Sequence, residues 1–245
     1  MVTSTLRHCG RAALLAMALL VAAPVTGPAQ EFAATGVQLL HGNGYELGPA
    51  RADILTLEHG STWRLGSNFF FFDVSEPFAR GTGVYGEWYS RLAWSRLGLG
   101  GAGRGLVRDV SFTVAINAGE GFRAYLAGAT LHLRVPGFAL FDVDLMAYDD
   151  RADDDVTFIV TPAWELPFRV GGAALRCRGF VDLIGREGGR AAQILAQPQL
   201  LLDLGRLWGE EGRWFVGLEY QYWRHKYGAA GVTESLPQLM LAWQF

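Results

Sequence analysis

Long segments in which apolar and polar residues alternate constrain the fold of this chain most. Between Asp109 and Ala118, one face carries Val110, Phe112, Val114 and Ile116, and the opposite face carries Ser111, Thr113, Ala115 and Asn117. A period of two is the pattern of a β-strand with two different faces. Comparable segments of ten to fourteen residues recur along the chain. A strand that crosses a bilayer needs about 9–11 residues, whereas globular strands average about 5–6, so the length favours strands that span a membrane.

Twelve such segments are predicted. They lie near residues 34–42, 51–60, 64–75, 82–94, 109–118, 122–135, 138–149, 155–167, 173–184, 190–203, 213–225 and 235–245. In lipid, every backbone polar group has to be paired inside the protein, and a closed barrel is the β-structure that achieves this. We therefore predict an all-β fold, a transmembrane antiparallel β-barrel of about 12 strands. The even number places both termini on the periplasmic side, as in bacterial barrels.

The connections between these segments alternate between the two ends of the predicted barrel. Those expected outside the cell are 43–44, 149–155, 186–189 and 227–234, and those expected in the periplasm are 60–63, 135–137 and 205–212. One further periplasmic connection, 95–108, is long, glycine-rich and basic. For this connection, a short helix and a mobile loop both stay open.

The first 29 residues have the composition of a secretory signal peptide. Arg7 and Arg11 precede an apolar run over 12–23, and small residues lead to a cleavage point after Ala29. The run is shorter than the roughly 20 residues that a transmembrane helix needs. The expected domains are therefore a signal peptide, 1–29, and an outer-membrane β-barrel, 30–245. The barrel keeps one cysteine, Cys177, so it has no internal disulfide.

The composition fits a chain that is surrounded by lipid. Hydrophobic residues make up 50% of the chain and charged residues only 18%, with a formal net charge of −3. A basic excess that would point to nucleic acid is missing, so we expect no nucleic-acid partner. The expected surroundings are the lipids of a Gram-negative outer membrane.

The last segment of the chain carries a strong signal for that location. Leu239, Leu241, Trp243 and Phe245 alternate with Gln238, Met240, Ala242 and Gln244, and the chain ends on the aromatic residue. Such an ending resembles the C-terminal signal that the outer-membrane assembly machinery reads. The sequence therefore predicts the barrel assembly machinery as a partner, through Phe245.

The polar faces of the segments should line the lumen. The acids are Glu58, Glu87, Asp142, Asp144, Glu165, Asp182, Asp203 and Glu219; the bases are Arg91, His132, Arg134, Arg176 and Arg178; the amides are Asn117, Gln197, Gln199, Gln221 and Gln238. Twelve strands predict a narrow pore, between the filled barrel of about eight strands and the open channel of about sixteen. Mixed charges favour an uncharged, hydrogen-bonding solute, since rings of one sign select ions. The plainer interpretation is a wall of ion pairs that satisfy one another.

Four consecutive phenylalanines, in the segment Gly66-Ser67-Asn68-Phe69-Phe70-Phe71-Phe72-Asp73-Val74, must divide between lumen and lipid. If Asn68 faces inward, so do Phe70 and Phe72; if Asp73 does, so do Phe69 and Phe71. Inward rings beside a polar side chain could stack on a flat solute such as a nucleobase. An aromatic strand that only packs against lipid and its neighbours is the alternative.

Two parts of the chain resemble the nucleoside-specific channel-forming Tsx family, which includes OmpK-like porins and related uncharacterised outer-membrane barrels. They are Glu58-His59-Gly60-Ser61-Thr62-Trp63 with the phenylalanine run, and Gly217-Leu218-Glu219-Tyr220-Gln221-Tyr222-Trp223 with Tyr227-Gly228. The resemblance implies a monomeric barrel of twelve strands that passes nucleosides and serves phages as a receptor. At matching positions, Glu58, Asn68, Phe70, Phe72 and Asp73 are the best binding candidates. The further pore-lining candidates are Glu87, Arg176, Arg178 and Glu219.

Two other classes of protein remain as alternatives. A lipid enzyme of the outer membrane would need a histidine beside a serine or an acid, and His59 with Ser61 is the one tempting pair. We predict no enzyme and no catalytic residues. A structural or adhesive barrel, or a phage receptor without selective transport, would carry its function in long outer loops. The scattered histidines and the acidic run 149–155 lack metal-ligand spacing, so we expect no cofactor and no metal.

Overall fold

The computed structural model describes residues 30–78, 82–100, 103 and 105–245, and the predicted signal peptide, 1–29, lies outside them. The strands are β1 (Gln30–Asn43), β2 (Arg51–Trp63), β3 (Gly66–Ser75), β4 (Gly83–Ala93), β5 (Val107–Gly119), β6 (Phe122–Leu133), β7 (Leu140–Asp150), β8 (Thr157–Val170), β9 (Ala173–Ile184), β10 (Gln193–Ala196), β11 (Gln199–Asp203), β12 (Trp214–Arg224) and β13 (Thr233–Gln244). They form one antiparallel sheet that closes on itself, because β13 pairs with both β1 and β12.

The ring has twelve arms, because β10 and β11 are two halves of one arm. Both halves pair with β9 on one side and β12 on the other. The break falls at Gln197–Pro198, where proline lacks the N–H that a strand ladder needs. The predicted fold class, an antiparallel barrel of twelve strands, is confirmed.

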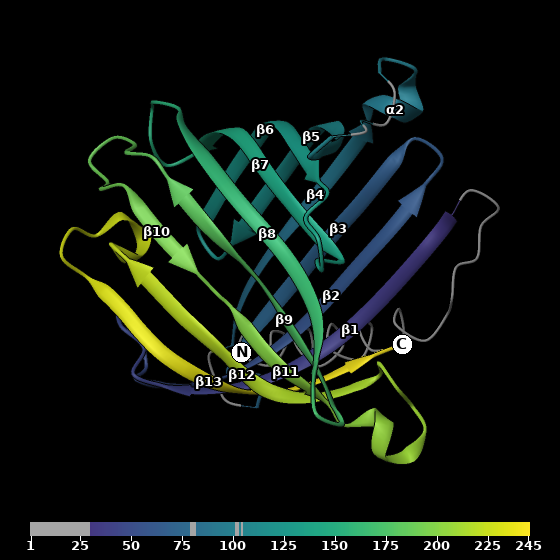
Figure 1. The fold of residues 1–245 in the computed structure, drawn as a ribbon. Coiled ribbons are helices and arrows are strands. Elements are labelled where there is room, and N and C mark those ends of the chain that lie inside the picture. The colour runs from purple at the N-terminus through teal and green to yellow at the C-terminus, as the bar shows by residue number, and fades with distance from the viewer. Residues whose placement is uncertain (1–29, 79–81, 101–102, 104) are drawn as a thin grey trace, which may run out of the picture. The chain divides into compact units, whose positions relative to one another are not determined.

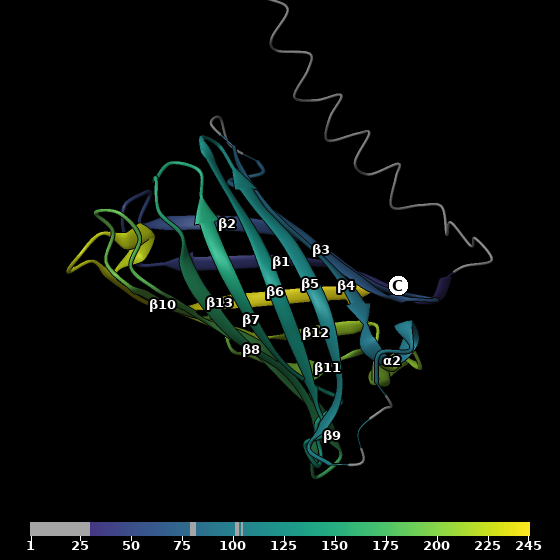
Figure 2. The ribbon, with the colours of Figure 1, turned by 90° about the horizontal axis from the view of Figure 1, so that it is seen from above.

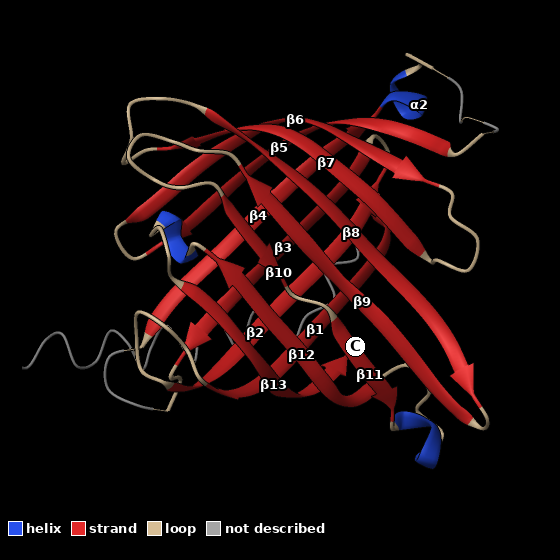
Figure 3. Cartoon of the chain, turned by 60° about the vertical axis from the view of Figure 1, so that its left-hand side comes forward, coloured by secondary structure: helices blue, strands red, loops and turns tan. Residues whose placement is uncertain are grey.

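The strands cross the barrel obliquely and wrap round a single interior (Figures 1 and 2). The C-terminal residue lies beside β1: Phe245 N–H donates to the carbonyl of Thr35, and Thr35 N–H donates to the carbonyl of Phe245. We call this end of the barrel the terminal end. It also carries α2 (Trp94–Leu97) and η1 (Gly205–Trp208), whereas η2 (Lys226–Gly228) lies at the opposite end, the loop end (Figure 3).

The connections sort as the sequence predicted. Those at 43–44, 149–155, 186–189 and 227–234 fall at the loop end, and those at 95–108, 135–137 and 205–212 fall at the terminal end. One boundary differs: β2 continues to Trp63 and the turn lies at Arg64–Leu65, not at 60–63. Gly60 stays in the ladder because it pairs with Phe69 of β3. Within the described residues, none of the helical segments, of at most four residues, has the length to cross a membrane.

The outer face of the sheet is apolar. In β13 the exposed positions alternate strictly with buried ones, so Leu239, Leu241 and Trp243 point outward while Gln238, Met240 and Ala242 point inward. Other strands present Trp88, Phe112, Val114, Leu145, Leu200 and Leu218 outward, each at least a third exposed. An outer surface of this kind is suited to contact with the hydrocarbon chains of lipids.

The interior is packed along two of its walls. One apolar cluster, centred on Tyr89, Leu126, Met146 and Ile159, covers the wall formed by β4 to β8. A second, with Leu40, Leu201, Phe215 and Met240, covers the wall formed by β1, β11, β12 and β13. Between these clusters the interior is polar, and this region contains the candidate site.

Candidate functional site

Charged side chains from several strands meet inside the barrel. We call eight of them the lumen belt: Glu58, Asp73, Glu87, Arg91, Asp144, Arg178, Asp182 and Glu219. Five belong to the nine site residues predicted from the sequence, and all but Asp73 were among the expected lumen residues. Each lies on the face of its strand that points into the barrel, as its pairing and hydrogen bonds show.

One ion pair crosses the lumen. Arg178 lies on β9 and Glu58 on β2, two strands that are separated round the ring by β1, β13, β12 and β11. The guanidinium Nη1 lies 2.8 Å from Oε1 of Glu58, and its Nε donates to Oε1 of Gln199 at 2.6 Å. Both side chains are more than four-fifths buried. The pair therefore links opposite walls and narrows the passage between them.

A second ion pair joins β4 to β7, three strands further round the ring. Arg91 on β4 donates through Nη2 to Asp144 on β7 at 2.9 Å and through Nε to Thr130 on β6 at 3.1 Å. Thr130 also donates to Asp144 and exchanges a hydrogen bond with Thr113. Asp144 is 5% exposed at its side chain. This network is fully partnered, so it holds the wall formed by β4 to β7 in one arrangement.

The other four carboxylates of the lumen belt have only neutral partners among the described residues. Glu87 accepts from the hydroxyls of Tyr85 and Tyr89 at 2.5 and 2.7 Å, and from Nδ2 of Asn117 at 3.1 Å. Asp73 accepts from Thr56 at 2.5 Å, and Asp182 from Thr161 at 2.6 Å.

Glu219 accepts from three glutamines, Gln197, Gln199 and Gln238, at 2.6–3.2 Å. Hydroxyl and amide donors satisfy these oxygens but do not neutralise their charge. Each of the four groups therefore accepts at least one hydrogen bond, and none of them forms an ion pair within the described residues.

Of the two arrangements of the phenylalanine run, the structure has the one in which Phe69 and Phe71 face inward together with Asp73. Phe71 contacts Tyr85 at 6.1 Å between ring centroids, and Phe69 packs on the buried cluster through Tyr89 at 6.4 Å. Asp73, Phe71 and Phe69 therefore share the inner face of β3.

Asn68, Phe70 and Phe72 do not line the lumen, contrary to the expectation for these three candidates. Phe70 pairs with Trp88, which is 44% exposed on the outer face, and stacks on His59 at 5.2 Å. The reason is the period of two: once Asp73 hydrogen-bonds to Thr56 inside the barrel, every even position of β3 points outward. The residue types gave no signal for this parity.

Arg176, the remaining predicted candidate, lies inside but nearer the terminal end. It pairs with Glu165 at 3.2 Å, donates to Gln244 at 3.0 Å and lies over the ring of Phe215 at 4.5 Å. Of the nine predicted site residues, the structure therefore brings five together in the lumen belt and places Arg176 beyond it.

Three further side chains near the terminal end form a chain that the sequence did not reveal. Ser111 Oγ lies 2.8 Å from Nε2 of His132, and Nδ1 of His132 lies 2.9 Å from Oδ1 of Asp142. They come from three adjacent strands, β5, β6 and β7, at neighbouring register positions. A serine, an imidazole and a carboxylate in this connectivity have the arrangement of an acyl-transfer triad. Ser111 is 1% exposed. By contrast, His59 and Ser61 share the outer face of β2, where His59 bonds to Thr35.

At the loop end, a buried lysine lies at the edge of the polar interior. Lys226 pairs with Glu234 at 2.5 Å, and its Nζ lies 5.3–5.9 Å from the ring centroids of Tyr45, Trp223 and Tyr227. Tyr45 donates to Gln238 of β13. Burial, followed by Glu219 and Glu234, raises the pKa of Tyr45 well above its ordinary value, so the hydroxyl stays protonated and able to donate.

Three acids of the loop end lie close enough together to hold a metal ion, but an arginine already forms ion pairs with two of them. They are Asp150, Asp153 and Glu187. Arg190 reaches Asp150 at 2.5 Å and Asp153 at 2.8 Å, so it supplies the positive charge that a metal would bring.

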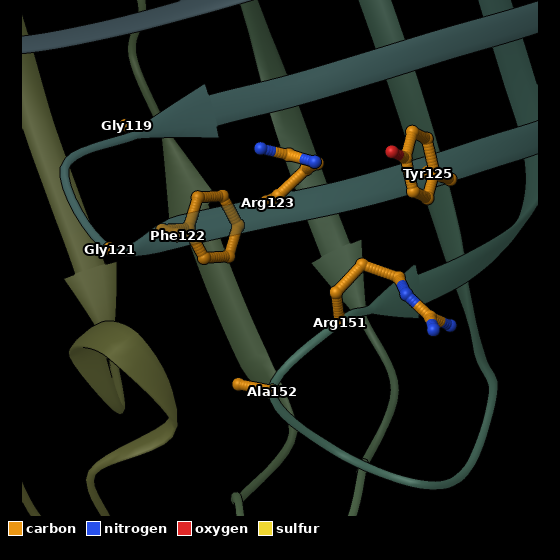
Figure 4. Close-up of a pocket in the computed structure, with 7 residues that line it drawn as sticks. All are labelled: Gly119, Gly121, Phe122, Arg123, Tyr125, Arg151 and Ala152. Atoms are coloured by element: carbon orange, nitrogen blue, oxygen red, sulfur yellow. The ribbon is translucent and has the colours of Figure 1, made fainter.

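Two hollows lie apart from the lumen belt. One, of about 320 Å³, lies at the loop end beside Gly119, Phe122, Tyr125 and Arg151 (Figure 4). Another, of about 290 Å³, is lined by residues such as Pro167, Arg176 and Phe215. Neither contains a residue of the lumen belt.

No protein-family model matches the chain, and no curated protein matches it. Among solved structures, it is similar to a KdgM porin in complex with disordered oligogalacturonate, with a TM-score of 0.51 and 9% identity over 86% of this chain and 99% of that one. It also matches a bacterial polysaccharide outer membrane secretin (TM-score 0.43, 10% identity, 87% and 98% covered). A third match is the translocator domain of the autotransporter NalP from Neisseria meningitidis (TM-score 0.32, 14% identity, 99% and 98% covered).

The similarity to the porin shows the fold of an outer-membrane β-barrel. Together with the apolar outer face, this fold places the protein in the outer membrane. At 9% identity, it carries nothing about the solute.

Proposed function

We propose that this protein is a narrow passive channel of the outer membrane for small polar solutes, with nucleosides as the expected class. The observation that carries the proposal is the polar interior of a closed barrel, which runs between two apolar walls. Cross-lumen contacts such as Arg178–Glu58 restrict the passage to one small solute at a time. We further propose that the barrel works as a monomer, as the resemblance to the Tsx family implies.

The aromatic side of the lumen supports a flat, hydrogen-bonding solute. Phe71, Tyr85 and Phe122 form a row of rings with centroids 6.1–6.2 Å apart. Glu87 and Asn117 lie beside this row. Rings of this kind stack on nucleobases, and polar groups beside them can bind the edge of the base.

Planar-bilayer recording tests the proposal. The purified protein should give a small conductance that falls when a nucleoside is added, and less so with a sugar or an amino acid. Phe71→Ala should weaken this block, whereas Phe70→Ala, one residue along on the outer face, should leave it unchanged. A protein that inserts but does not conduct would favour a structural barrel instead.

A second candidate function, hydrolysis of an ester, is favoured by the Ser111–His132–Asp142 chain alone. With Nδ1 protonated toward Asp142, Nε2 of His132 can take the proton of Ser111 as Oγ attacks an ester carbonyl. His132 would return that proton to the departing alkoxide, and water would then split the acyl–serine bond. Since Ser111 is 1% exposed, a substrate would reach it only after lumen side chains move aside.

Covalent labelling separates the two functions. An active serine should react with a fluorophosphonate, and Ser111→Ala should abolish the reaction. Absence of labelling in the folded barrel would leave the three residues as a structural chain of hydrogen bonds.

A further inference from the structure

The lumen belt contains more negative than positive groups. Arg91 and Arg178 are both engaged by carboxylates, Asp144 and Glu58. Asp73, Glu87, Asp182 and Glu219 remain without an ion-pair partner within the described residues. Removing carboxylates from water is costly unless a positive charge compensates for them. A cation that enters this part of the interior would reduce that cost.

The unbalanced carboxylates lie within range of one another, although they come from different walls. Glu87 on β4 and Asp73 on the adjacent β3 lie two register positions apart on the inner face, and Asp182 projects into the same interior from β9. A charge that enters the middle of the barrel is therefore exposed to several of them at once. Rings of acidic side chains of this kind select cations in channels.

An unpartnered oxygen beside Glu87 points to the same kind of ligand. Asn117 is 5% exposed and donates through Nδ2 to Oε1 of Glu87, whereas its Oδ1 has no hydrogen-bond partner. Rotating the amide by half a turn would bring Oδ1 against the carboxylate, so Glu87 fixes the orientation. A buried acceptor without a partner is unfavourable by about 1–3 kcal/mol. A cation held between this oxygen and the carboxylates would satisfy it.

We propose that the lumen is cation-selective, and that Glu87 and Asn117, with Asp73 and Asp182 around them, form the site that holds the permeating cation. The inference rests on the proposed channel function and adds a preference among ions to a passage that also admits uncharged polar solutes. Small monovalent cations, and polar solutes that carry an ammonium group, suit carboxylate and carbonyl oxygens. Anionic saccharides should be excluded, since both arginines of the lumen belt are already paired.

The first test measures ion selectivity directly. In a planar bilayer with a potassium chloride gradient, the reversal potential should show a several-fold preference for K⁺ over Cl⁻. Glu87→Gln and Asp182→Asn should each lower the preference, and the double variant should bring the two permeabilities close to equal. Asp154→Asn, which removes an exposed acid from the loop end, is the matched control and should change nothing. Conductance without preference in the unaltered protein would overturn the inference while leaving the channel in place.

The second test does not depend on conduction. A cation that binds the folded barrel raises its thermal midpoint, so potassium chloride should stabilise it more than the chloride of the bulky cation N-methylglucamine at equal ionic strength. The difference should disappear in Glu87→Gln and in Asn117→Ala, and persist in Asp154→Asn. Equal midpoints in both salts would contradict the site. A potassium-dependent midpoint in a barrel that does not conduct would retain the site and reject the channel.

Discussion

At the scale of single residues, the interior is governed by how charge is partnered. The two guanidinium groups of the lumen belt each have a carboxylate within 3 Å, and each carboxylate has a hydrogen-bond donor. Breaking one partner of a buried pair leaves the other charged and unpaired, which is far more destabilising than removing both. Individual residues should therefore differ strongly in their tolerance to substitution.

Arg178→Gln should destabilise the barrel by about 3–5 kcal/mol, because it leaves Glu58 buried without a cation. Adding Glu58→Gln should recover most of that loss, since neither charge then remains. Urea unfolding in detergent micelles, followed by tryptophan fluorescence, measures both effects. Arg151→Gln, at an ion pair that is mostly exposed, should stay within about 0.5 kcal/mol of the parent. A double variant no more stable than Arg178→Gln would argue against the pairing.

Glu187 predicts a pH dependence at the loop end. Burial, and then the neighbouring Asp150, Asp153 and Asp155, raise the pKa of this carboxyl above its ordinary value of 4.5, while Arg190 pairs with the first two of these acids. A raised pKa in the folded state means that the folded loop binds a proton more readily than the unfolded one. Stability contributed here is therefore greatest below the ordinary pKa and falls as pH rises through the raised one.

Hydrogen exchange is the measurement for Glu187, because the Asp150 amide donates to its Oε1 at 2.9 Å. Protection of the loop 185–192, corrected for the intrinsic rate, should increase as pH falls from neutral toward 4.5. Glu187→Gln should flatten this dependence. Protection that decreases on acidification would reverse the assigned direction of the pKa.

At the scale of elements, neighbouring strands can approach closely where a glycine lies opposite a backbone carbonyl, because no Cβ stands between them. Gly179 of β9 has a φ of +155° and lies opposite the break between β10 and β11. A Cβ there would lie 2.5 Å from the carbonyl oxygen of Gln197 and 2.8 Å from Cα of Pro198. The interrupted arm therefore depends on the missing side chain.

Gly179→Ala should lower the yield of folded barrel and weaken the ladder between β9 and the interrupted arm. Gly60→Ala is the matched control, since a Cβ at Gly60 meets nothing within 4 Å. Refolding yield in detergent, measured by the mobility of unheated samples on gels, compares the two. Equal yields would show that the arm can shift at no cost.

The final strand makes a prediction about assembly. Phe245 is 39% exposed and contacts Trp243 at 4.6 Å, so it contributes little burial to the folded barrel. We propose that the barrel assembly machinery binds it before folding. Phe245→Ala should reduce the amount inserted in cells several-fold, while refolding of the purified chain into micelles stays unchanged. An equal loss in both settings would assign Phe245 a structural role only.

At the scale of the whole molecule, closure of the sheet explains both faces at once. Pairing of β13 with β1 and β12 leaves no free edge, so backbone groups need nothing from the surroundings. The outer face can then be apolar while charged and polar groups lie between the apolar clusters of the interior, which inverts the arrangement of a water-soluble protein. This inversion is the physical basis for the outer-membrane location and for the proposed channel.

Leu145→Arg tests that inversion. Leu145 lies in the middle of β7, 43% exposed on the outer face. In a bilayer, an arginine at that depth should cost about 2–4 kcal/mol, whereas on a water-facing surface it would cost almost nothing. Leu207→Arg, at a site 78% exposed in η1 beyond the strands, should be neutral in both cases. Stability in lipid vesicles, from denaturant titration, decides between them.

The sequence by itself determined the number of arms, their approximate limits and most residues that face the lumen. It could do so because side-chain direction in a strand has a period of two and because a lipid-facing wall must be apolar at every second position. Residues such as Glu87, Asp182 and Glu219 were identified in this way. The close agreement over β9, expected at 173–184 and found at Ala173–Ile184, has the same origin.

Only the tertiary structure decided which side of the phenylalanine run faces inward and which side chains meet. The alternation within β3 is satisfied equally well with Asn68 or with Asp73 inside, and pairing with β2 and β4 selects Asp73. The Arg178–Glu58 contact joins strands that meet across the interior only when the ring closes, and the Ser111–His132–Asp142 contacts depend on the register of three neighbouring strands. Register and closure are properties of the whole sheet, so no single segment of sequence contains them.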